Sequence, residues 1–169
     1  MDVFEAVAKR HSYRETFTDQ PVSREDLVKI VLAGIHAPSG KTEQTTSFVI
    51  VDDPQLLGKI AAIVDTPAAK TAKAMIVCVI DPRPVIGNIS FAVEDYAAAV
   101  ENMLIASTAL GLGSCWCEGR TLPHEEAFKQ LLGVPEEKRL LTLVTIGVPA
   151  EWPTREKKSL EEVIHWERY

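Results

Sequence analysis

The sequence predicts a single α+β domain in which helices flank a central, mostly antiparallel sheet. Residues 74–80 are continuously apolar and rich in β-branched side chains, which is typical of a strand buried on both faces, and residues 140–148 also predict a buried strand. Residues 91–110 are apolar around most of a helical circumference and predict a deeply buried helix. Because helices and strands do not alternate strictly along the chain, the pattern favours an α+β fold over a β-α-β fold.

Two helices are expected in the N-terminal part of the chain. Residues 3–9 predict a short helix with its apolar side chains on one face. Ser23-Arg-Glu-Asp26 has the spacing of a capping box, with Asp in place of the usual Glu or Gln, and begins a helix that keeps the helical period to Ile35. The segment Ala37-Pro38-Ser39-Gly40 ends that helix, since Pro cannot continue it.

The remaining elements follow from similar signals. A strand is expected over residues 47–51, and Asp53-Pro54 predicts a helix that runs to about Val64. Residues 81–90 contain two prolines and one glycine and predict a loop. Three further elements are expected: a strand over 114–118, a helix over 123–132 and a short terminal helix that starts at Ser159.

The composition limits the class of protein. A chain of 169 residues, of which 46% are hydrophobic, fits one domain over residues 1–169 with a sizeable core. The formal net charge of −6 argues against a general nucleic-acid binder. No apolar run approaches the roughly 20 residues of a membrane span, and three cysteines do not make a disulfide framework. We therefore expect a cytoplasmic protein that binds neither nucleic acid nor membrane.

Positive charge gathers at two places in this acidic chain. Near the N-terminus, Arg10, Ser12 and Arg14 could hold a phosphate through charge-assisted hydrogen bonds. Near the C-terminus, Arg155 and Lys157 belong to a second basic cluster. Each cluster could instead be a solvated charged segment with weak ion pairs, and neither decides the question alone.

Two other segments could approach a ligand. Residues 37–44, APSGKTEQ, offer hydroxyl, amide and backbone donors, although they could equally be a helix stop followed by a loop. Residues 110–120, LGLGSCWCEGR, contain glycines that let backbone approach a ligand closely. Cys115 and Cys117 share one face of a regular strand, but two thiols are too few for a structural metal site. We predict no metal and interpret both as small packing residues.

Taken together and in this order, these segments resemble the nitroreductase family of FMN-dependent oxidoreductases along essentially the whole chain. RHSYRETFTDQPVSREDL is similar to the family opening R-[RH]-S-x-R-x-[FY], and APSGKTEQTTSFVIV to its A-P-S-x-x-N-x-Q-P-W segment. EDYAAAVENMLIASTALGLGSCWCEG resembles its D-x-[GA]-A-A-x-[EQ]-N-[ML]-L segment and glycine-rich continuation. LLTLVTIGVPAE, the basic cluster and LEEVIHWERY resemble its ending. Thr42 stands where the family has Asn, and residues 81–90 replace the longer lid of many members.

The resemblance implies a homodimer with two equivalent FMN sites at the subunit interface, where the long helix would be buried. It implies hydride transfer from NADH or NADPH to the flavin, then two-electron reduction of a nitroaromatic, quinone or similar acceptor, in ping-pong order. The flavin carries the chemistry, so no side chain is expected to be catalytic. The alternative is a flavin-binding storage or sensor protein without NAD(P)H turnover.

The resemblance also assigns cofactor-binding residues by position. The phosphate, ribityl chain and pyrimidine edge would contact Arg10, Ser12 and Arg14, with His11 offering mostly backbone. Arg155 and Lys157 would complete the phosphate clamp. The partner subunit would line the ring through the segment that contains Pro38, Ser39, Gly40, Thr42 and Gln44. Along the ring would run Trp116, Cys117, Glu118 and Gly119, the last two with backbone N–H groups near its redox-active nitrogen.

Overall fold

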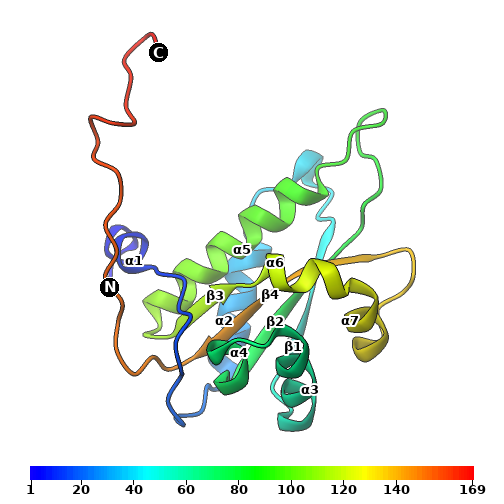
Figure 1. Ribbon diagram of the computed structural model, residues 1–169. Helices are drawn as coiled ribbons and strands as arrows, with labels where there is room; N and C mark the ends of the chain where they lie inside the picture. The colour runs from blue at the N-terminus through cyan, green and yellow to red at the C-terminus, as the bar shows by residue number, and fades with distance from the viewer.

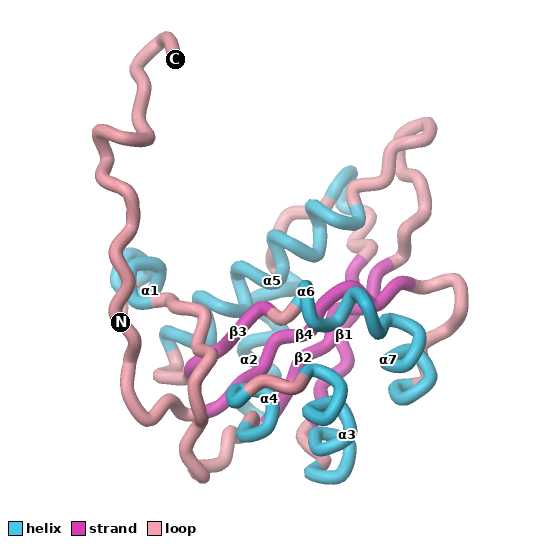
Figure 2. The backbone as a smooth tube through the Cα atoms, in the orientation of Figure 1, coloured by secondary structure: helices cyan, strands magenta, loops and turns pink.

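A four-stranded sheet with helices on both faces forms the body of the protein in the computed structural model, which describes all 169 residues (Figures 1 and 2). The strands are β1 (Thr46–Val51), β2 (Ala74–Ile80), β3 (Gly113–Trp116) and β4 (Arg139–Gly147). The helices are α1 (Val3–Lys9), α2 (Arg24–Ile35), α3 (Pro54–Val64), α4 (Pro67–Thr71), α5 (Ala92–Ala109), α6 (Glu118–Thr121) and α7 (Glu125–Leu132). Two 3-10 helices, η1 (Gly40–Thr42) and η2 (Leu122–His124), lie in the connections.

Every pairing in the sheet is antiparallel, in the order β1-β2-β4-β3. Strand β2 is buried along its whole length because its side chains alternate between two cores. Met75 and Val77 pack into the core that includes α3 and α7, whereas Ile76 and Cys78 pack into the core that includes α2 and α5. The predicted α+β class is confirmed, and so is burial of this strand on both faces.

The long helix α5 is buried along one face rather than around its circumference. Val100 and Met103 are fully buried in the core shared with α2. Gly34 of α2 permits this close approach, since a Cβ there would lie 3.0 Å from Cγ of Met103. On the opposite side Ile105 is only half-buried, and Val93 near the start of the helix is 56% exposed. The expected deep burial is therefore correct for one side, and the other side has no partner within the chain.

The predicted strand over residues 114–118 is two residues too long. Cys117 leaves the extended conformation, with φ −113° and ψ 49°, and Glu118 begins α6. Helix α4 was not anticipated from the sequence, although Thr66 caps it and Pro67 occupies its first turn. Both differences concern short elements, of four residues in β3 and five in α4.

The predicted terminal helix from Ser159 is wrong, because the structure contains only one turn there. The backbone N–H of Ser159 donates to the Glu162 carboxylate at 2.7 Å, so the local capping signal is present. Every residue from 154 to 169 is exposed, however, and the turn has no surface to pack on. Short helices are stabilised mainly by such packing.

Apolar side chains remain exposed at both ends of the chain. Helix α1 turns Val3, Phe4 and Val7 outward, with Phe4 83% exposed. Residues 150–169, here called the C-terminal arm, run past α1 and away from the sheet, and they expose Trp166 among other apolar side chains (Figure 1). The accessible surface is 10066 Å², whereas a compact monomer of this mass exposes about 8,200 Å². Part of this surface therefore lacks a partner within the chain.

Two sequence-based expectations stay predictions. They are the single domain over residues 1–169 and the cytoplasmic location. None of the helices has both the length and the apolar character needed to cross a bilayer.

Candidate cofactor site

Polar side chains from the two ends of the chain converge on a pocket of about 220 Å³. Its lining residues are Arg10, His11, Ser12, Arg14, Arg155 and Lys157. The first four follow α1, and the last two belong to the C-terminal arm. The structure thus brings together all six residues of the expected phosphate clamp, and we call this the cation pocket.

Tyr13 holds the two halves of the cation pocket together. This residue is 2% exposed, and its backbone N–H donates to the Ser114 carbonyl at 2.8 Å, which attaches the segment to β3. Its hydroxyl donates to the Thr16 carbonyl at 2.8 Å and accepts from the Ala150 N–H at 3.2 Å, where the arm begins. One buried aromatic side chain therefore positions both the N-terminal segment and the start of the arm.

Two glycines at strand ends make room for the side chains of Tyr13 and Phe17. A Cβ at Gly147 would lie 2.5 Å from Cγ of Phe17, and a Cβ at Gly113 would lie 3.2 Å from Cγ of Tyr13. The rings of Tyr13 and Phe17 pack with their centroids 4.7 Å apart. The absence of side chains at the glycines lets the aromatic pair lie directly against β3 and β4.

The cation pocket carries positive charge that the chain does not neutralise. Arg10 pairs with Glu101 at 3.2 Å. Arg14, Arg155 and Lys157 take part in none of the ion pairs of the chain. Such a pocket favours an anionic ligand, and phosphate oxygens accept the bidentate hydrogen bonds that Arg offers.

A larger cavity of about 510 Å³ adjoins the cation pocket, since Arg14 lines both. We call it the central cavity. It is lined by Arg14, Thr66, Pro67, Ala68, Cys115, Trp116, Cys117, Gly119 and Arg120. A Cβ at Gly119 would meet nothing within 4 Å, so the backbone there faces open space. The volume lies in the roughly 300–1,000 Å³ range of small-molecule sites.

Glu118, an expected site residue, is not among the residues that line the central cavity. Its carboxylate accepts hydrogen bonds from the Tyr96 hydroxyl at 2.8 Å and from Nε1 of Trp116 at 2.9 Å. Burial, together with the bond to Glu118, raises the pKa of Tyr96 above its ordinary value. The carboxylate is thus held toward α5, and the side chain is not offered to a ligand in the cavity.

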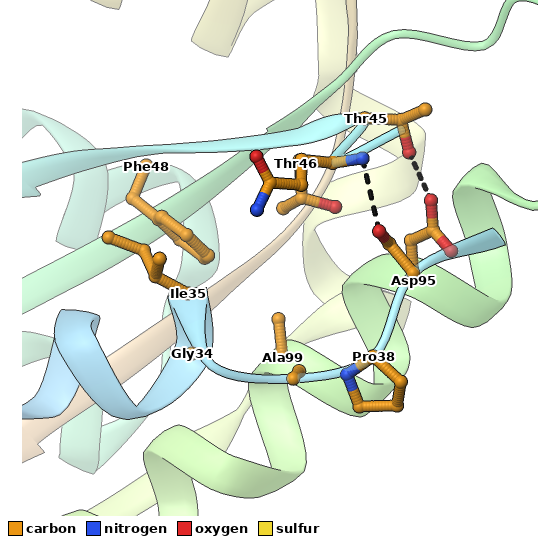
Figure 3. Close-up of a pocket in the computed structure, with 11 residues that line it drawn as sticks. Gly34, Ile35, Pro38, Thr45, Thr46, Phe48, Asp95 and Ala99 are labelled. Carbon is orange, nitrogen blue, oxygen red and sulfur yellow. Dashed lines mark hydrogen bonds between the residues drawn. The ribbon is translucent and has the colours of Figure 1, made fainter. Parts of the chain in front are cut away.

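The segment of residues 37–44 lies on the other side of the sheet. Pro38, Ser39 and Gln44 line a separate pocket of about 220 Å³, which α2, β1 and α5 complete (Figure 3). We call it the loop pocket. Gly40 and Thr42 line neither this pocket nor the central cavity. Within one chain, the structure therefore does not bring this segment to the cation pocket.

Asp95 of α5 fixes the position of that segment. The residue is 5% exposed, and its carboxylate accepts from the Thr45 hydroxyl at 2.6 Å (Figure 3) and from the Gly40 N–H at 2.7 Å. Phe91 closes on the same loop, since a Cβ at Gly40 would lie 2.4 Å from Cδ2 of Phe91. The loop is consequently held in one conformation from the start of α5.

Several residues that shape these pockets were missed by sequence reasoning. Thr66, Pro67 and Ala68 wall the central cavity because α4 begins there, and a Thr-Pro pair before a helical stretch is a start signal that could have found it. Arg120 lines the cavity one residue after the expected Gly119. Asp95 gives no local signal, since its two partners lie 55 and 50 residues away.

Comparisons with known proteins agree with this fold. The chain matches the family model described as the nitroreductase family over residues 7–85 and 67–148. It is 34% identical over 146 residues to a protein of Archaeoglobus fulgidus, covering 84% of this chain and 82% of that protein. It is 31% identical over 170 residues to a protein of Methanothermobacter thermautotrophicus, covering 100% of this chain and 88% of that protein. Both relatives carry the provisional name NADH dehydrogenase/NAD(P)H nitroreductase.

A solved structure of a protein with the same provisional name has a similar fold. The crystal structure of a Parabacteroides distasonis protein with that provisional name is similar to this chain with a TM-score of 0.85. The two sequences are 27% identical, and the similarity covers 99% of this chain and 98% of the other. The likeness therefore extends over the helices and strands that form the cation pocket and the central cavity.

Proposed function

The chain belongs to the nitroreductase family, and on this premise we propose that it is an FMN-dependent oxidoreductase. FMN, when bound, would supply the chemistry: it accepts a hydride from NADH or NADPH and then passes two electrons to a nitroaromatic, quinone or similar acceptor, in ping-pong order. The observation that carries the proposal is the joining of the cation pocket to the central cavity through Arg14.

The cation pocket suits the phosphate end of FMN. A phosphate monoester carries a charge of about −2 near neutral pH. Arg14, Arg155 and Lys157 supply cations that have no other partner, and Ser12 adds a hydroxyl donor. The assignment also explains why an acidic chain places unpaired cations from its two ends around one pocket.

The central cavity suits the flavin ring. Trp116, Pro67 and Ala68 give its walls apolar surface, against which a planar ring can pack. Arg14 and Arg120 place positive charge at the same cavity, which would stabilise the negative charge of a reduced flavin. Because the Glu118 carboxylate is engaged with Tyr96 and Trp116, it is not offered to the ring as a proton donor or acceptor.

We infer that the working unit is a homodimer. Val93 near the start of α5, the apolar side of α1 and the C-terminal arm all leave apolar side chains exposed in the single chain. Exposed apolar surfaces of this kind mark interaction sites, and large obligate interfaces resemble a core cut in half. A second copy would cover these surfaces and would bring its own 37–44 segment to the central cavity of the first.

The test is the visible spectrum of the purified protein before and after anaerobic addition of NADH and, separately, of NADPH. A yellow protein that bleaches with either donor supports the proposal and identifies the donor. A yellow protein that bleaches with neither supports the storage or sensor alternative instead. A colourless protein that also takes up no added FMN contradicts both.

A further inference from the structure

The central cavity has a cation that it does not share with the cation pocket. Its wall includes two arginines, Arg14 and Arg120, and no aspartate or glutamate. Arg14 also lines the cation pocket, whereas Arg120 does not. Arg120 therefore lies on a part of the wall beyond the position that we propose for the phosphate of FMN, and its charge is available to a different group.

No carboxylate of the chain forms an ion pair with Arg120. Glu118, two residues before it, has both carboxylate oxygens engaged in other hydrogen bonds. The pKa of Asp65 is lowered mainly by Lys70, which pairs with it at 2.6 Å, and only to a lesser extent by Arg120. The acids near Arg120 are thus held by other partners, and its guanidinium keeps its hydrogen-bond donors free.

Thr66 adds a hydroxyl to the same wall of the cavity. Its oxygen accepts from the Ala69 N–H at 3.1 Å as the cap of α4, which leaves its own O–H free to donate. Asp65, the residue before Thr66, is also the carboxyl that lies near Arg120, so the hydroxyl and the guanidinium belong to one side of the cavity. A guanidinium with a hydroxyl donor beside it suits the oxygens of a carboxylate or a phosphate.

We propose that Arg120 and Thr66 bind an anionic group of a substrate that enters the central cavity. The inference rests on the proposed function, which places the uncharged ring of oxidised FMN in this cavity and its phosphate in the cation pocket. Such a group has two possible sources: a carboxylate of the electron acceptor, and the phosphates of NADH or NADPH. Both present anionic oxygens, which the two side chains recognise in the same way.

The consequence is selection of substrates by charge. A neutral analogue of the same shape still packs on the apolar walls but loses the charge-assisted hydrogen bond to Arg120, a loss of roughly 10- to 150-fold in affinity. Because Arg120 is exposed to solvent, we expect the lower end of that range and a further decrease as salt is added. Stabilisation of a reduced flavin, in contrast, gives no such selection in the oxidised protein.

The first measurement is the equilibrium binding of 4-nitrobenzoate and of its neutral amide, 4-nitrobenzamide, to the oxidised, FMN-loaded protein. Binding is followed through the change in flavin absorbance, and no reductant is present to convert either compound. If the acceptor carries the anionic group, the unaltered chain should bind the benzoate about 10-fold more tightly than the amide, and Arg120→Ala should bind both equally. Arg120→Lys should keep part of the preference, and the matched control Arg24→Ala, whose arginine is paired with Asp52, should keep all of it.

The same titration with NADP⁺, which cannot reduce the flavin, tests the second source. A loss of affinity in Arg120→Ala for 4-nitrobenzoate alone assigns the group to the acceptor, and a loss for NADP⁺ alone assigns it to the donor. Thr66→Asp keeps an acceptor for the cap of α4 but places a carboxylate beside Arg120, so it should abolish whichever preference the unaltered chain shows. Unchanged affinity of Arg120→Ala for both ligands would overturn the proposal.

The midpoint potential of the bound flavin separates this role from an effect on the flavin alone. A lower potential in Arg120→Ala, together with unchanged affinity for both anions, would assign the charge of Arg120 to the reduced flavin and refute this inference. A yellow protein that does not discriminate by charge therefore refutes the role of Arg120 and Thr66 only. A protein that takes up no FMN refutes the proposed function and this inference together.

Discussion

Two segments that resemble the flavin-binding parts of one family behave very differently in this structure. The segment of residues 10–14 joins the C-terminal arm around an open, positively charged pocket, and several of its cations have no partner. The segment of residues 37–44 is instead tied down, with Asp95 holding Gly40 and Thr45 on the opposite side of the sheet. One chain therefore forms the cation pocket but does not bring the second segment to it.

This difference supports our proposal that the site is composite, with parts from two subunits. A loop that is rigid and turned away from its own cavity is suited to present a fixed surface to another molecule. An extended arm without packing of its own is suited to lie over a neighbour. Symmetric dimers satisfy both requirements at once, since each copy supplies its loop to the other. Variants of the arm, of Arg14, of the loop and of Asp95 test in turn whether two chains build one site.

Removal of the C-terminal arm should have the largest effect. A chain that ends after Ala150 keeps the backbone bond to Tyr13 but loses Arg155, Lys157 and the exposed apolar residues of the arm. We expect a monomer by sedimentation and an FMN affinity lowered by roughly 100-fold or more, since two charge-assisted contacts are lost. Replacing Arg155 and Lys157 together by Ala in the full chain should weaken FMN binding and leave the dimer intact. Dimeric, flavin-loaded truncated protein would contradict the role of the arm.

Arg14→Ala should have the next largest effect, because Arg14 lines both the cation pocket and the central cavity. Loss of its charged hydrogen bonds should lower FMN affinity by roughly 10- to 150-fold, measured by fluorescence titration of the apoprotein. The matched control is Arg24→Ala, since Arg24 is bound to Asp52 away from both pockets. Equal retention of flavin in the two variants would refute the assignment of Arg14.

Mixing two defective chains should restore part of the binding if the site is composite. Gly40→Ala forces a Cβ to within 2.4 Å of the Phe91 ring and should disturb the 37–44 loop. In a hybrid dimer with Arg14→Ala, one site receives an intact Arg14 and an intact loop. Co-refolding equal amounts should therefore restore FMN to about a quarter of all sites, the fraction expected from random pairing. No recovery beyond the sum of the separate variants would show that each chain builds its site alone.

The smallest effect on FMN binding is expected from Asp95, whose role is to hold the loop. Asp95→Ala leaves the Gly40 N–H and the Thr45 hydroxyl without their partner, which should lower the free energy of unfolding by about 2–4 kcal/mol. Asp95→Asn keeps a similar shape and can still pair with both groups, so it should retain most of that stability. Urea unfolding of the two variants measures the difference, and equal stability of the Ala variant and the unaltered chain would contradict this role.

Much of the fold could be predicted because it depends on local pattern. The apolar run of β2 and the Asp53-Pro54 start of α3 are written into short stretches of sequence, and the structure has both elements there. The helix expected from Ser159 carries an equally good capping signal, yet only a turn forms, because its residues find no surface within the chain. Local signals therefore predict an element only where tertiary packing supports it.

For the candidate site, too, some features are evident from the sequence and others depend on tertiary packing. The sequence determined which residue types are available: the basic clusters at the two ends, the glycines around β3 and the pair of thiols at Cys115 and Cys117. Only the tertiary structure decided that Tyr13 joins the two basic clusters, that α4 walls the cavity and that the 37–44 loop faces away. The physical reason is that these outcomes depend on contacts between residues far apart in the chain, and such contacts leave no periodicity or spacing for a single sequence to show.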